Sequence, residues 1–325
     1  MDAHKLMKKA YEGGVNFFDN AEAYGMGAAE LLMGEAVALG IERNAWTRED
    51  LVLSTKIFFG SMPPRGSSGY VKSRKSVNRI GLSRKHIIEG TKASLRRMKL
   101  KYVDLVFCHR YDPLCNMEEV VRSFNTLIDM GLCFYWGTSE WTAQQIQEAK
   151  GVAERLGLVG PSFDQPEYNL FAREKVEVEF AQLYPSIGLT TWSPLASGVL
   201  TGKYSKGVPE GSRLSLKEFK ARPDYKYFMR LAEQTEKLRP VAAKLNCTLG
   251  QLALAWCLAN PNVSTVIGGA SNEKQIEENL GALEVVDKLT PEILKEIDQI
   301  MGTKPKLSRS MAQVQYRLRP LRHKL

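Results

Sequence analysis

Seven apolar, strand-like runs alternate with helical patterns along most of the chain, and this alternation restricts the fold more than any other feature. The runs are Val15–Asp19, Leu51–Lys56, Val103–His109, Phe134–Ser139, Ser162–Gln165, Leu189–Ser193 and Ser264–Gly268. Apolar residues recur near a 3.6-residue period in the segments between them, which are Ala29–Leu39, Ile87–Met98, Met117–Met130, Ala143–Arg155, Glu174–Leu183 and Leu249–Leu258. Strands joined by crossover helices are parallel. The 325 residues therefore suit one α/β domain, a (β/α)8 barrel with extensions.

The start of the chain departs from this pattern. It opens on a helical segment, Ala3–Glu12, so an eight-stranded barrel with this order of elements would lack its first strand and the loop after it. We therefore expect an open barrel with two unpaired strand edges, poorer folding and weaker ligand binding. Ser83 and Thr142 are expected helix N-caps, and Thr290 is another, followed by proline at the first helical position.

Two basic segments account for the net charge of +9. Residues 61–88 contain seven Lys or Arg and no acid, and residues 303–325 again contain seven and no acid, so the rest of the chain carries about −5. We interpret both as solvated segments and expect no nucleic-acid partner, because such a binder more often shows a basic face on its folded body. We expect one barrel domain over residues 1–305 and a basic, disordered tail over residues 306–325.

Two long stretches interrupt the alternation. Gly60–Gly81 is rich in Gly, Ser, Pro and basic residues and follows the run that ends at Lys56. Lys203–Tyr227 follows the run that ends at Ser193. Both lie on the side of the barrel where its strands end, and long loops there are usually lids or binding loops.

Other features argue against several classes of protein. No segment approaches the ~20 apolar residues that a membrane span needs, and no apolar signal segment opens the chain. The cysteines are odd in number and lack C-x-x-C spacing; they are Cys108, Cys115, Cys133, Cys247 and Cys257. This usage favours a reduced, cytoplasmic compartment and gives no indication of a metal site.

Four polar residues lie at or just beyond the ends of the first three runs: Asp19, Tyr24, Lys56 and His109. Parallel barrel strands end at one rim, where such barrels carry out their chemistry. Tyr24 could give a proton to a carbonyl oxygen, Lys56 could stabilise the phenolate that remains, and Asp19 could hold the lysine. His109 could donate to the same oxygen. Each residue alone also has a structural interpretation, but the four together favour a catalytic site.

The sequence has no G-x-G-x-x-G after a strand, so we expect no Rossmann-type cofactor site. Phosphates in barrels often bind near the last two strands and an adjacent helix N-terminus. That region contains Ser193–Gly198, Lys203, Arg213 and Gly268–Asn272. Ser271 is either a helix N-cap or a phosphate ligand. Trp192 either stacks on a nicotinamide or fills the barrel mouth.

With these residues the chain resembles the aldo-keto reductase family, and within it the voltage-gated potassium channel β-subunit branch, most of all its plant members. The resemblance extends from about Met1 to Pro305. The matching stretches are Gly14–Glu22, Ser54–Phe58, Gly81–Ile87, Tyr135–Ser139, Thr191–Leu195, Ser212–Arg213 and Gly269–Asn272. The family's first strand and the Thr-Trp pair after it have no counterpart, from which we expect impaired activity.

The resemblance implies a (β/α)8 barrel, an NADPH cofactor and no metal. It implies a catalytic tetrad of Asp19, Tyr24, Lys56 and His109. It implies that Ser139, Gln165 and Trp192 hold the nicotinamide. The residues that it implies at the phosphates and adenosine are Ser193, Leu195, Ser197, Lys203, Arg213, Gly269, Ser271, Gln275, Glu278 and Asn279.

Two functions follow from the resemblance. The first is an NADPH-dependent oxidoreductase that reduces aldehydes or ketones, with Tyr24 as the proton donor. Animal channel β-subunits carry asparagine where this chain has His109, and the histidine of ordinary reductases favours turnover. The alternative is a regulatory β-subunit that binds the cytoplasmic domain of a potassium channel and uses NADPH as a redox ligand. The channel branch implies a homotetramer, cytoplasmic or peripheral to a membrane.

Overall fold

The centre of the molecule is one parallel sheet. The computed structural model describes residues 3–61, 74–221 and 225–306, and among these the strand order is β1-β2-β3-β4-β5-β6-β7. The strands are β1 (Phe17–Phe18), β2 (Val52–Ile57), β3 (Val103–Cys108), β4 (Cys133–Ser139), β5 (Phe163–Gln165), β6 (Gly188–Thr191) and β7 (Thr265–Val266). The prediction of parallel strands in chain order is confirmed, with strands slightly shorter than the apolar runs.

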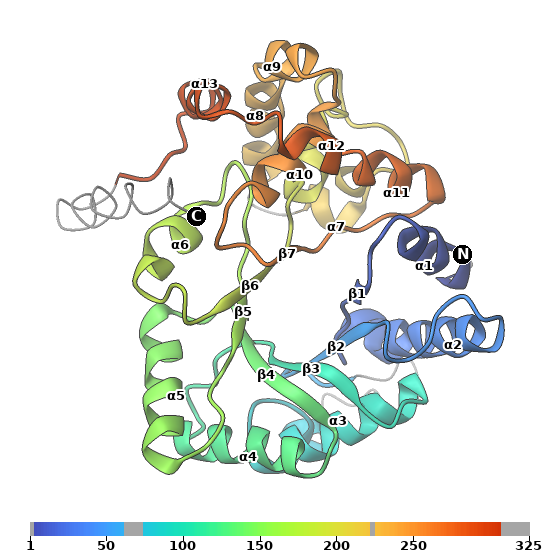
Figure 1. Cartoon of the computed structure of the whole chain (residues 1–325), viewed down its shortest axis with the longest axis vertical. Coiled ribbons are helices and arrows are strands. Elements are labelled where there is room, and N and C mark those ends of the chain that lie inside the picture. The colour runs from blue at the N-terminus through green and yellow to red at the C-terminus, as the bar shows by residue number, and fades with distance from the viewer. Residues whose placement is uncertain (1–2, 62–73, 222–224, 307–325) are drawn as a thin grey trace.

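The sheet curls like a barrel wall, with helices around its outer face (Figure 1). Within the described residues β1 pairs only with β2, and β7 pairs only with β6. The curl is therefore open between β1 and β7. Residues on both faces of β2 and β4 are buried, as expected for parallel strands covered on both sides. The molecule has the α/β architecture of a parallel barrel that is open on one side.

The outer layer contains the helices expected from the periodic segments of the sequence, one of them broken, and several others that the sequence analysis did not indicate. They are α1 (Ala3–Glu12), α2 (Ala28–Glu42), α3 (Arg84–Met98), α4 (Met117–Asp129), α5 (Ala143–Leu156), α6 (Glu174–Glu177), α7 (Lys217–Lys220), α8 (Tyr225–Glu236), α9 (Arg239–Lys244), α10 (Leu249–Leu258), α11 (Glu273–Leu280), α12 (Leu283–Val286) and α13 (Pro291–Met301). Short 3₁₀ turns are η1 (Tyr24–Gly27), η2 (Arg74–Arg79), η3 (Glu179–Gln182), η4 (Ala196–Thr201) and η5 (Arg213–Ser215). The three predicted N-caps are confirmed, since each side chain accepts a bond from a backbone N–H in the first turn.

Two predicted segments differ in the structure. The helix expected over Glu174–Leu183 is broken at Val178 into α6 and η3, and Val178 has a φ of −118°. This residue is β-branched, which weakens a short helix. The stretch Lys203–Tyr227, expected as a loop, contains η5, α7 and the first residues of α8. Within Gly60–Gly81, residues 74–79 form η2, while residues 62–73 and the tail 307–325 lie outside the described residues.

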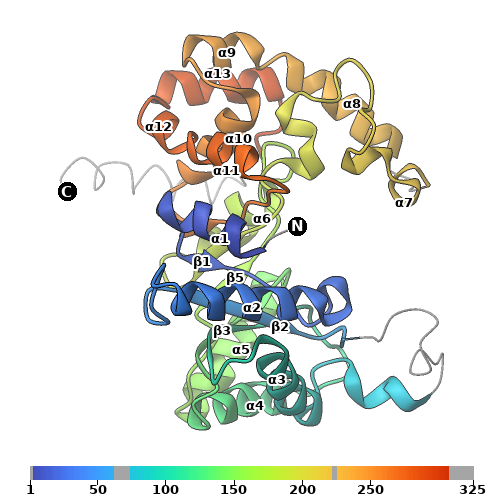
Figure 2. The ribbon, with the colours of Figure 1, turned by 90° about the vertical axis from the view of Figure 1, so that its right-hand side faces the viewer.

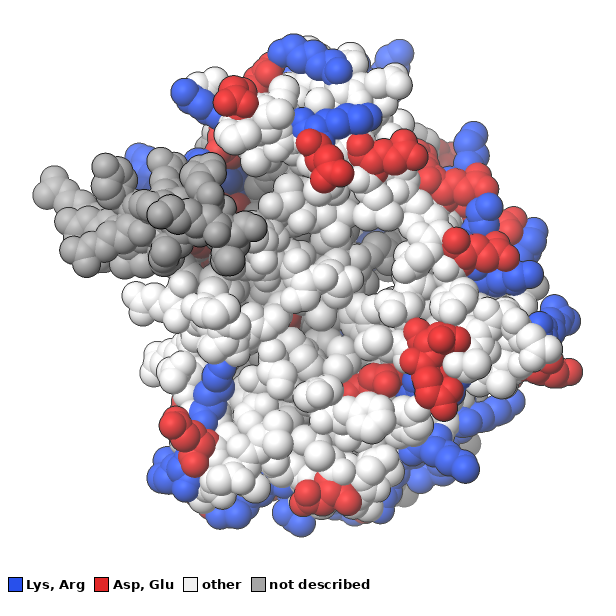
Figure 3. Space-filling view, viewed as in Figure 1, with Lys and Arg blue, Asp and Glu red and all other residues white. Residues whose placement is uncertain are grey.

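Charged side chains are mixed on the surface. On the face shown in Figure 3, Lys and Arg lie beside Asp and Glu around the periphery, and the middle is largely uncharged. Many of them pair across helices, as Lys9 does with Glu277 and Lys244 with Glu296. In the described parts of the chain we find no helix whose length and apolar content would let it cross a bilayer.

Helices α2 and α3 pack closely because one position between them has no side chain. Figure 2 shows α2 lying across the sheet with α3 beside it. Gly34 lies within α2, and a Cβ added there would overlap the backbone carbonyl oxygen of Met98, the last residue of α3. A backbone atom cannot move aside as a flexible side chain can. Gly34 therefore sets the distance between these two helices.

We predict opposite effects for two Gly→Ala changes. Alanine favours a helix over glycine by up to about 1 kcal/mol. Gly151→Ala in α5, where nothing lies within 4 Å of the new Cβ, should gain part of that. Gly34→Ala should instead lose about 1–3 kcal/mol through overpacking. Urea unfolding of both variants measures this, and equal shifts in the same direction would contradict the close approach of α2 and α3.

Candidate active site

A buried ion pair lies at the rim where β1 and β2 end. The side chain of Lys56 in β2 is completely buried, and its ammonium donates to the Asp19 carboxylate, which follows β1. The same ammonium donates to the Asn20 carbonyl oxygen at 2.8 Å. The second oxygen of Asp19 accepts from the Ser54 hydroxyl at 2.6 Å. An unpaired charge at this depth would be very costly, so the pair holds the two strand ends together.

Tyr24 brings a hydroxyl to this ammonium. It begins η1, and its hydroxyl oxygen lies 3.3 Å from the Lys56 Nζ. The ammonium also lies 4.8 Å from the centre of the tyrosine ring. The Tyr24 side chain remains 40% exposed. A phenol is therefore in contact with a buried positive charge on one side and reachable from outside on the other.

His109 completes the group of four. It follows β3, is almost completely buried, and lies edge-on to the Tyr24 ring with centroids 5.8 Å apart. Burial, together with the positive charges of Lys56 and Arg110, lowers the pKa of its imidazole to about 3. Its Nδ1 is buried and has no hydrogen-bond partner among the described residues. The ring is a neutral group beside Tyr24 at the mouth.

Polar side chains continue the site along the rim to β5. Gln165 in β5 donates at 3.3 Å to the Asp19 oxygen that also accepts from Ser54, and the Ser139 hydroxyl in β4 donates to the Gln165 carbonyl at 3.0 Å. Arg110 donates to the Ser139 hydroxyl oxygen at 3.2 Å. Ser139 and Gln165, both named from the sequence, therefore lie beside the four central residues. The expected nicotinamide site requires this position.

Trp192 follows β6, and a residue that the sequence did not indicate holds it. The indole Nε1 donates to the Glu140 carboxylate at 2.8 Å, and the same oxygen accepts from the backbone N–H of Glu167 at 2.5 Å. Glu140 itself has a φ of +59°, a conformation that costs energy for a residue other than glycine. The indole is thus fixed at the rim by an acid at the end of β4.

The loop after β6 offers backbone N–H groups and a lysine. Ala196, Ser197 and Gly198 have φ values of 45°, 58° and 88°, and successive residues in such conformations can form an anion-binding concavity. A Cβ at Gly198 would come within 2.8 Å of the Lys203 Nζ, so the ammonium lies directly against this turn. Ser193 and Leu195, the other residues named from the sequence here, begin the same loop.

The loop after β7 contains the remaining residues named from the sequence. The Ser271 hydroxyl donates to the Gln275 side chain at 3.0 Å. The N-cap of α11 is Asn272, which accepts from the Gln275 N–H, so the interpretation of Ser271 as the cap is wrong by one residue. Gly269 precedes this turn and Glu278 and Asn279 lie in α11.

Arg213 lies in η5, outside both of these loops. Its guanidinium carbon is 5.3 Å from the centre of the Phe219 ring, and its side chain is exposed. The β6 and β7 loops are neighbours because Thr191 pairs with Val266 in the sheet.

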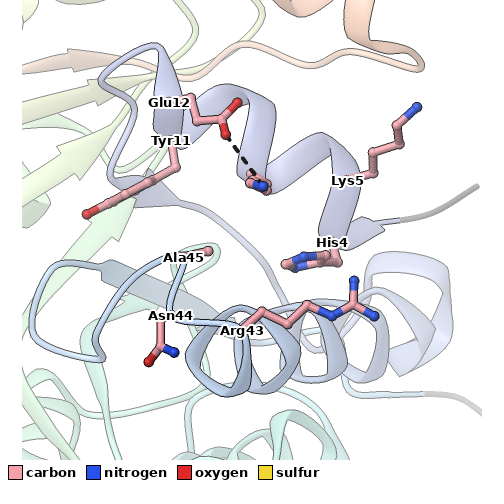
Figure 4. Close-up of a pocket in the computed structure, with 8 residues that line it drawn as sticks. His4, Lys5, Tyr11, Glu12, Arg43, Asn44 and Ala45 are labelled. Carbon is pink, nitrogen blue, oxygen red and sulfur yellow. Dashed lines mark ion pairs between the residues drawn. The ribbon is translucent and has the colours of Figure 1, made fainter.

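A separate hollow of about 780 Å³ lies between α1 and α2 (Figure 4). Its lining residues are His4, Lys5, Lys8, Tyr11, Glu12, Arg43, Asn44 and Ala45. None of them is a residue of the rim. Two of its charged groups, Lys8 and Glu12, are exposed and pair with each other at 3.7 Å. The hollow lies in the outer helix layer and is not part of the candidate active site.

The sequence missed residues whose roles depend on contacts far along the chain. Glu140 and Ser54 hold site residues in place, but neither occupies a distinctive sequence pattern. Glu140 directly follows the polar strand end at Ser139, which is the one signal that could have indicated it. Phe59, three residues after Lys56, packs edge-on against His109 with centroids 5.0 Å apart.

Comparisons with known proteins found a matching family model and similar plant proteins. The model of the Aldo/keto reductase family matches residues 1–301. A "Probable voltage-gated potassium channel subunit beta" from Arabidopsis thaliana is 52% identical over 308 residues, which cover 94% of this chain and 89% of that protein. A protein with the same description from Oryza sativa subsp. japonica is 50% identical over 313 residues, covering 95% of this chain and 90% of that protein.

The buried pair generates a prediction about stability. Lys56→Met leaves the Asp19 carboxylate buried without its ammonium, and breaking such a pair costs about 3–5 kcal/mol. Adding Asp19→Asn removes the remaining charge, so the double variant should be more stable than Lys56→Met alone. Urea unfolding at pH 7 measures both. A double variant that loses the sum of the two single effects would mean that the two charges do not interact.

The pKa of His109 generates a second prediction. Its folded-state pKa of about 3 lies below the ordinary value of about 6.5, so the folded state binds fewer protons between these values. Stability should therefore fall as pH drops through this window. His109→Asn should show a shallower fall between pH 7 and pH 4 in urea unfolding. Parallel profiles for the two proteins would argue against a buried neutral imidazole.

Proposed function

The chain belongs to the aldo/keto reductase family, and we propose that it is an NADPH-dependent reductase of aldehydes and ketones. The observation that carries this proposal is the contact between the Tyr24 hydroxyl and the buried Lys56 ammonium at 3.3 Å, beside a neutral His109. These groups surround one point at the rim. Together they can bind a carbonyl oxygen and give it a proton.

In this proposal Tyr24 protonates the carbonyl oxygen. When bound, NADPH supplies the hydride that the carbonyl carbon receives. As charge develops on the oxygen, the Tyr24 O–H donates its proton to it, and the product is an alcohol. The Lys56 ammonium stabilises the phenolate left on Tyr24. Since the Tyr24 side chain is 40% exposed, water can return the proton.

Asp19 and His109 act on orientation. Asp19 keeps the Lys56 ammonium at the tyrosine, and its other oxygen is held by Ser54 and Gln165. The His109 ring lies edge-on to the Tyr24 ring, with centroids 5.8 Å apart. A neutral imidazole with hydrogen-bonding capacity can orient a carbonyl oxygen without competing with Tyr24 as an acid.

The rim offers matching groups for a dinucleotide. Ser139 and Gln165 lie beside the quartet and would hold the nicotinamide amide, with Trp192 as a stacking surface. The left-handed turn at Ala196–Gly198 and the Lys203 ammonium against it suit a phosphate. Ser271 and Gln275 would hold further polar groups, and Arg213, with its planar fork, suits the 2′-phosphate of NADPH. Ser193, Leu195, Ser197, Gly269, Glu278 and Asn279 belong to the same proposed site.

A second function has one observation in its favour. Both plant relatives carry the description of a probable potassium channel β-subunit. In this alternative the chain binds the cytoplasmic part of a channel, as a homotetramer, and NADPH is a redox ligand with little turnover. In both proposals the barrel domain comprises residues 1–305. An aldehyde panel with purified protein, monitored by NADPH absorbance, separates turnover from binding alone.

The role of Tyr24 as proton donor can be tested by deleting its hydroxyl group. Tyr24→Phe keeps the ring and deletes the hydroxyl, and turnover should fall at least ~10²-fold, the usual scale of general acid catalysis, with NADPH affinity nearly unchanged. His109→Asn should have a smaller effect, because the proton donor remains. Steady-state kinetics and cofactor titration measure both. A larger loss in His109→Asn than in Tyr24→Phe would identify the histidine as the donor.

The cofactor preference tests the phosphate side. Arg213 should contact the 2′-phosphate that NADH lacks, because a guanidinium fork binds phosphate well. The unmodified chain should therefore bind NADPH more tightly than NADH, and Arg213→Ala should narrow the difference. Lys206→Ala removes a different exposed positive charge from the segment between β6 and Arg213 and serves as a charge control. Equal dissociation constants for the two cofactors in the unmodified chain would remove the basis for this role.

A further inference from the structure

Glu22 is a buried carboxylate that the proposed mechanism does not use. Its side chain is almost completely buried, and one oxygen, Oε1, receives three donors. They are the backbone N–H groups of Phe58 and Gly60, each at 2.8 Å, and the Nε2 of His86 at 3.1 Å. Because a carboxylate can only accept, this contact places the imidazole proton of His86 on Nε2. So many donors on one oxygen indicate a fixed anchor point.

This carboxylate connects the two loops that carry the central residues of the site. Glu22 lies two residues before Tyr24, and its own N–H donates to the Lys56 carbonyl at 3.2 Å. The segment Phe58–Gly60, which Glu22 holds, begins two residues after Lys56. His86 lies in the first turn of α3, where Ser83 caps the helix by accepting from its N–H. Three separate elements are therefore joined at one side chain.

The residue at the centre of the anchored segment is Phe59. Glu22 accepts from the backbone N–H groups of the residues before and after Phe59. The Phe59 ring lies edge-on to His109 and to Phe58, with ring centroids 5.0 Å apart in each case. The side chain is 43% exposed. This exposed aromatic ring packs against the His109 imidazole, which in turn packs against Tyr24, so it lies at the mouth beside the candidate catalytic groups.

Two glycines leave room for this arrangement. Gly60 has a φ of +73°, and a Cβ there would overlap the Arg79 carbonyl oxygen. Gly90 in α3 faces the other carboxylate oxygen, and a Cβ there would lie 3.3 Å from it. Larger residues at either position would push the segment or the helix away from Glu22. The local sequence is thus consistent with a loop held in one conformation.

We propose that Glu22 is a positioning residue that fixes Phe59 as a specificity-determining wall of the carbonyl site. The wall favours carbonyl compounds with an aromatic or bulky apolar group over small aliphatic ones, because ring contacts and excluded water reward such a group. This inference rests on the proposed reductase function for its substrate preference. The anchoring of the loop by Glu22 rests on the hydrogen bonds alone.

The preference is tested by a ratio of specificity constants. The ratio of kcat/KM for benzaldehyde to kcat/KM for propanal, with NADPH, should fall about 10-fold in Phe59→Ala. Glu22→Ala should lower the same ratio, and Glu22→Gln should keep it near the parent value, since the amide oxygen still accepts from both N–H groups. In the double variant Glu22→Ala with Phe59→Ala the ratio should fall no further than in Phe59→Ala alone.

A matched control separates positioning from general loss of stability. Glu177→Gln alters another largely buried carboxylate, on α6, which accepts from Arg173 and Tyr168 and is not a residue of the proposed site. It should leave the ratio unchanged even if it lowers the unfolding midpoint. An unchanged ratio in Phe59→Ala would overturn the specificity role of the ring. Additive effects in the double variant would show that Glu22 does not act through Phe59.

Amide hydrogen exchange tests the anchor without any activity. The N–H groups of Phe58 and Gly60 should be protected in the unmodified chain and in Glu22→Gln, and should lose protection in Glu22→Ala. Exchange of both amides at the rate of an unstructured peptide in the unmodified chain would overturn the anchoring role. If the chain reduces neither aldehyde, the reductase function fails together with the wall, while the exchange result still decides whether Glu22 holds the loop.

Discussion

The buried positive charge of Lys56 is the constraint on which the rest of the rim depends. An ammonium at this depth requires a carboxylate and further acceptors, and Asp19 and the Asn20 carbonyl supply them. Both acceptors lie just after β1, so satisfying the charge fixes the end of β1 against β2. Tyr24 follows a few residues later and is carried to the same ammonium. The arrangement of the rim thus follows from the need to provide acceptors for one buried ammonium.

The sequence predicted the elements that depend on local pattern. The seven strands, most of the helices expected from apolar period and the three N-caps recur in the structure with small shifts in their ends, whereas α7, α8, α9 and α12 were not predicted. The four central residues could be placed together because parallel strands end at one rim. The break of the helix at Val178 could not be predicted, because tertiary packing decides among the competing conformations of a short segment with β-branched residues.

Residues that act through distant contacts were not visible in the sequence. Glu140 binds an indole 52 positions away, and Glu22 binds a histidine 64 positions away. Neither spacing has a period, and an acid in a loop is by default a solvated residue. The turn at Ala196–Gly198 was indicated only as a glycine- and serine-containing loop. Its left-handed backbone belongs partly to Ala196 and Ser197, residue types that rarely adopt it.

The pairing of the sheet is uneven, and the strands at its centre, β2, β3 and β4, are joined by more residue pairs than the others. Four residue pairs join β2 to β3 and five join β3 to β4, whereas two join each of the pairs β1–β2, β4–β5, β5–β6 and β6–β7. Lys56 and His109 are at the ends of the long ladders, and the turn with Lys203 follows a short one. Local opening begins where few backbone bonds must break. The β6–β7 side can therefore loosen while the strands that end at Lys56 and His109 keep their register, and Asp19 and Tyr24, which follow the short ladder of β1, depend on the Lys56 ammonium for their place.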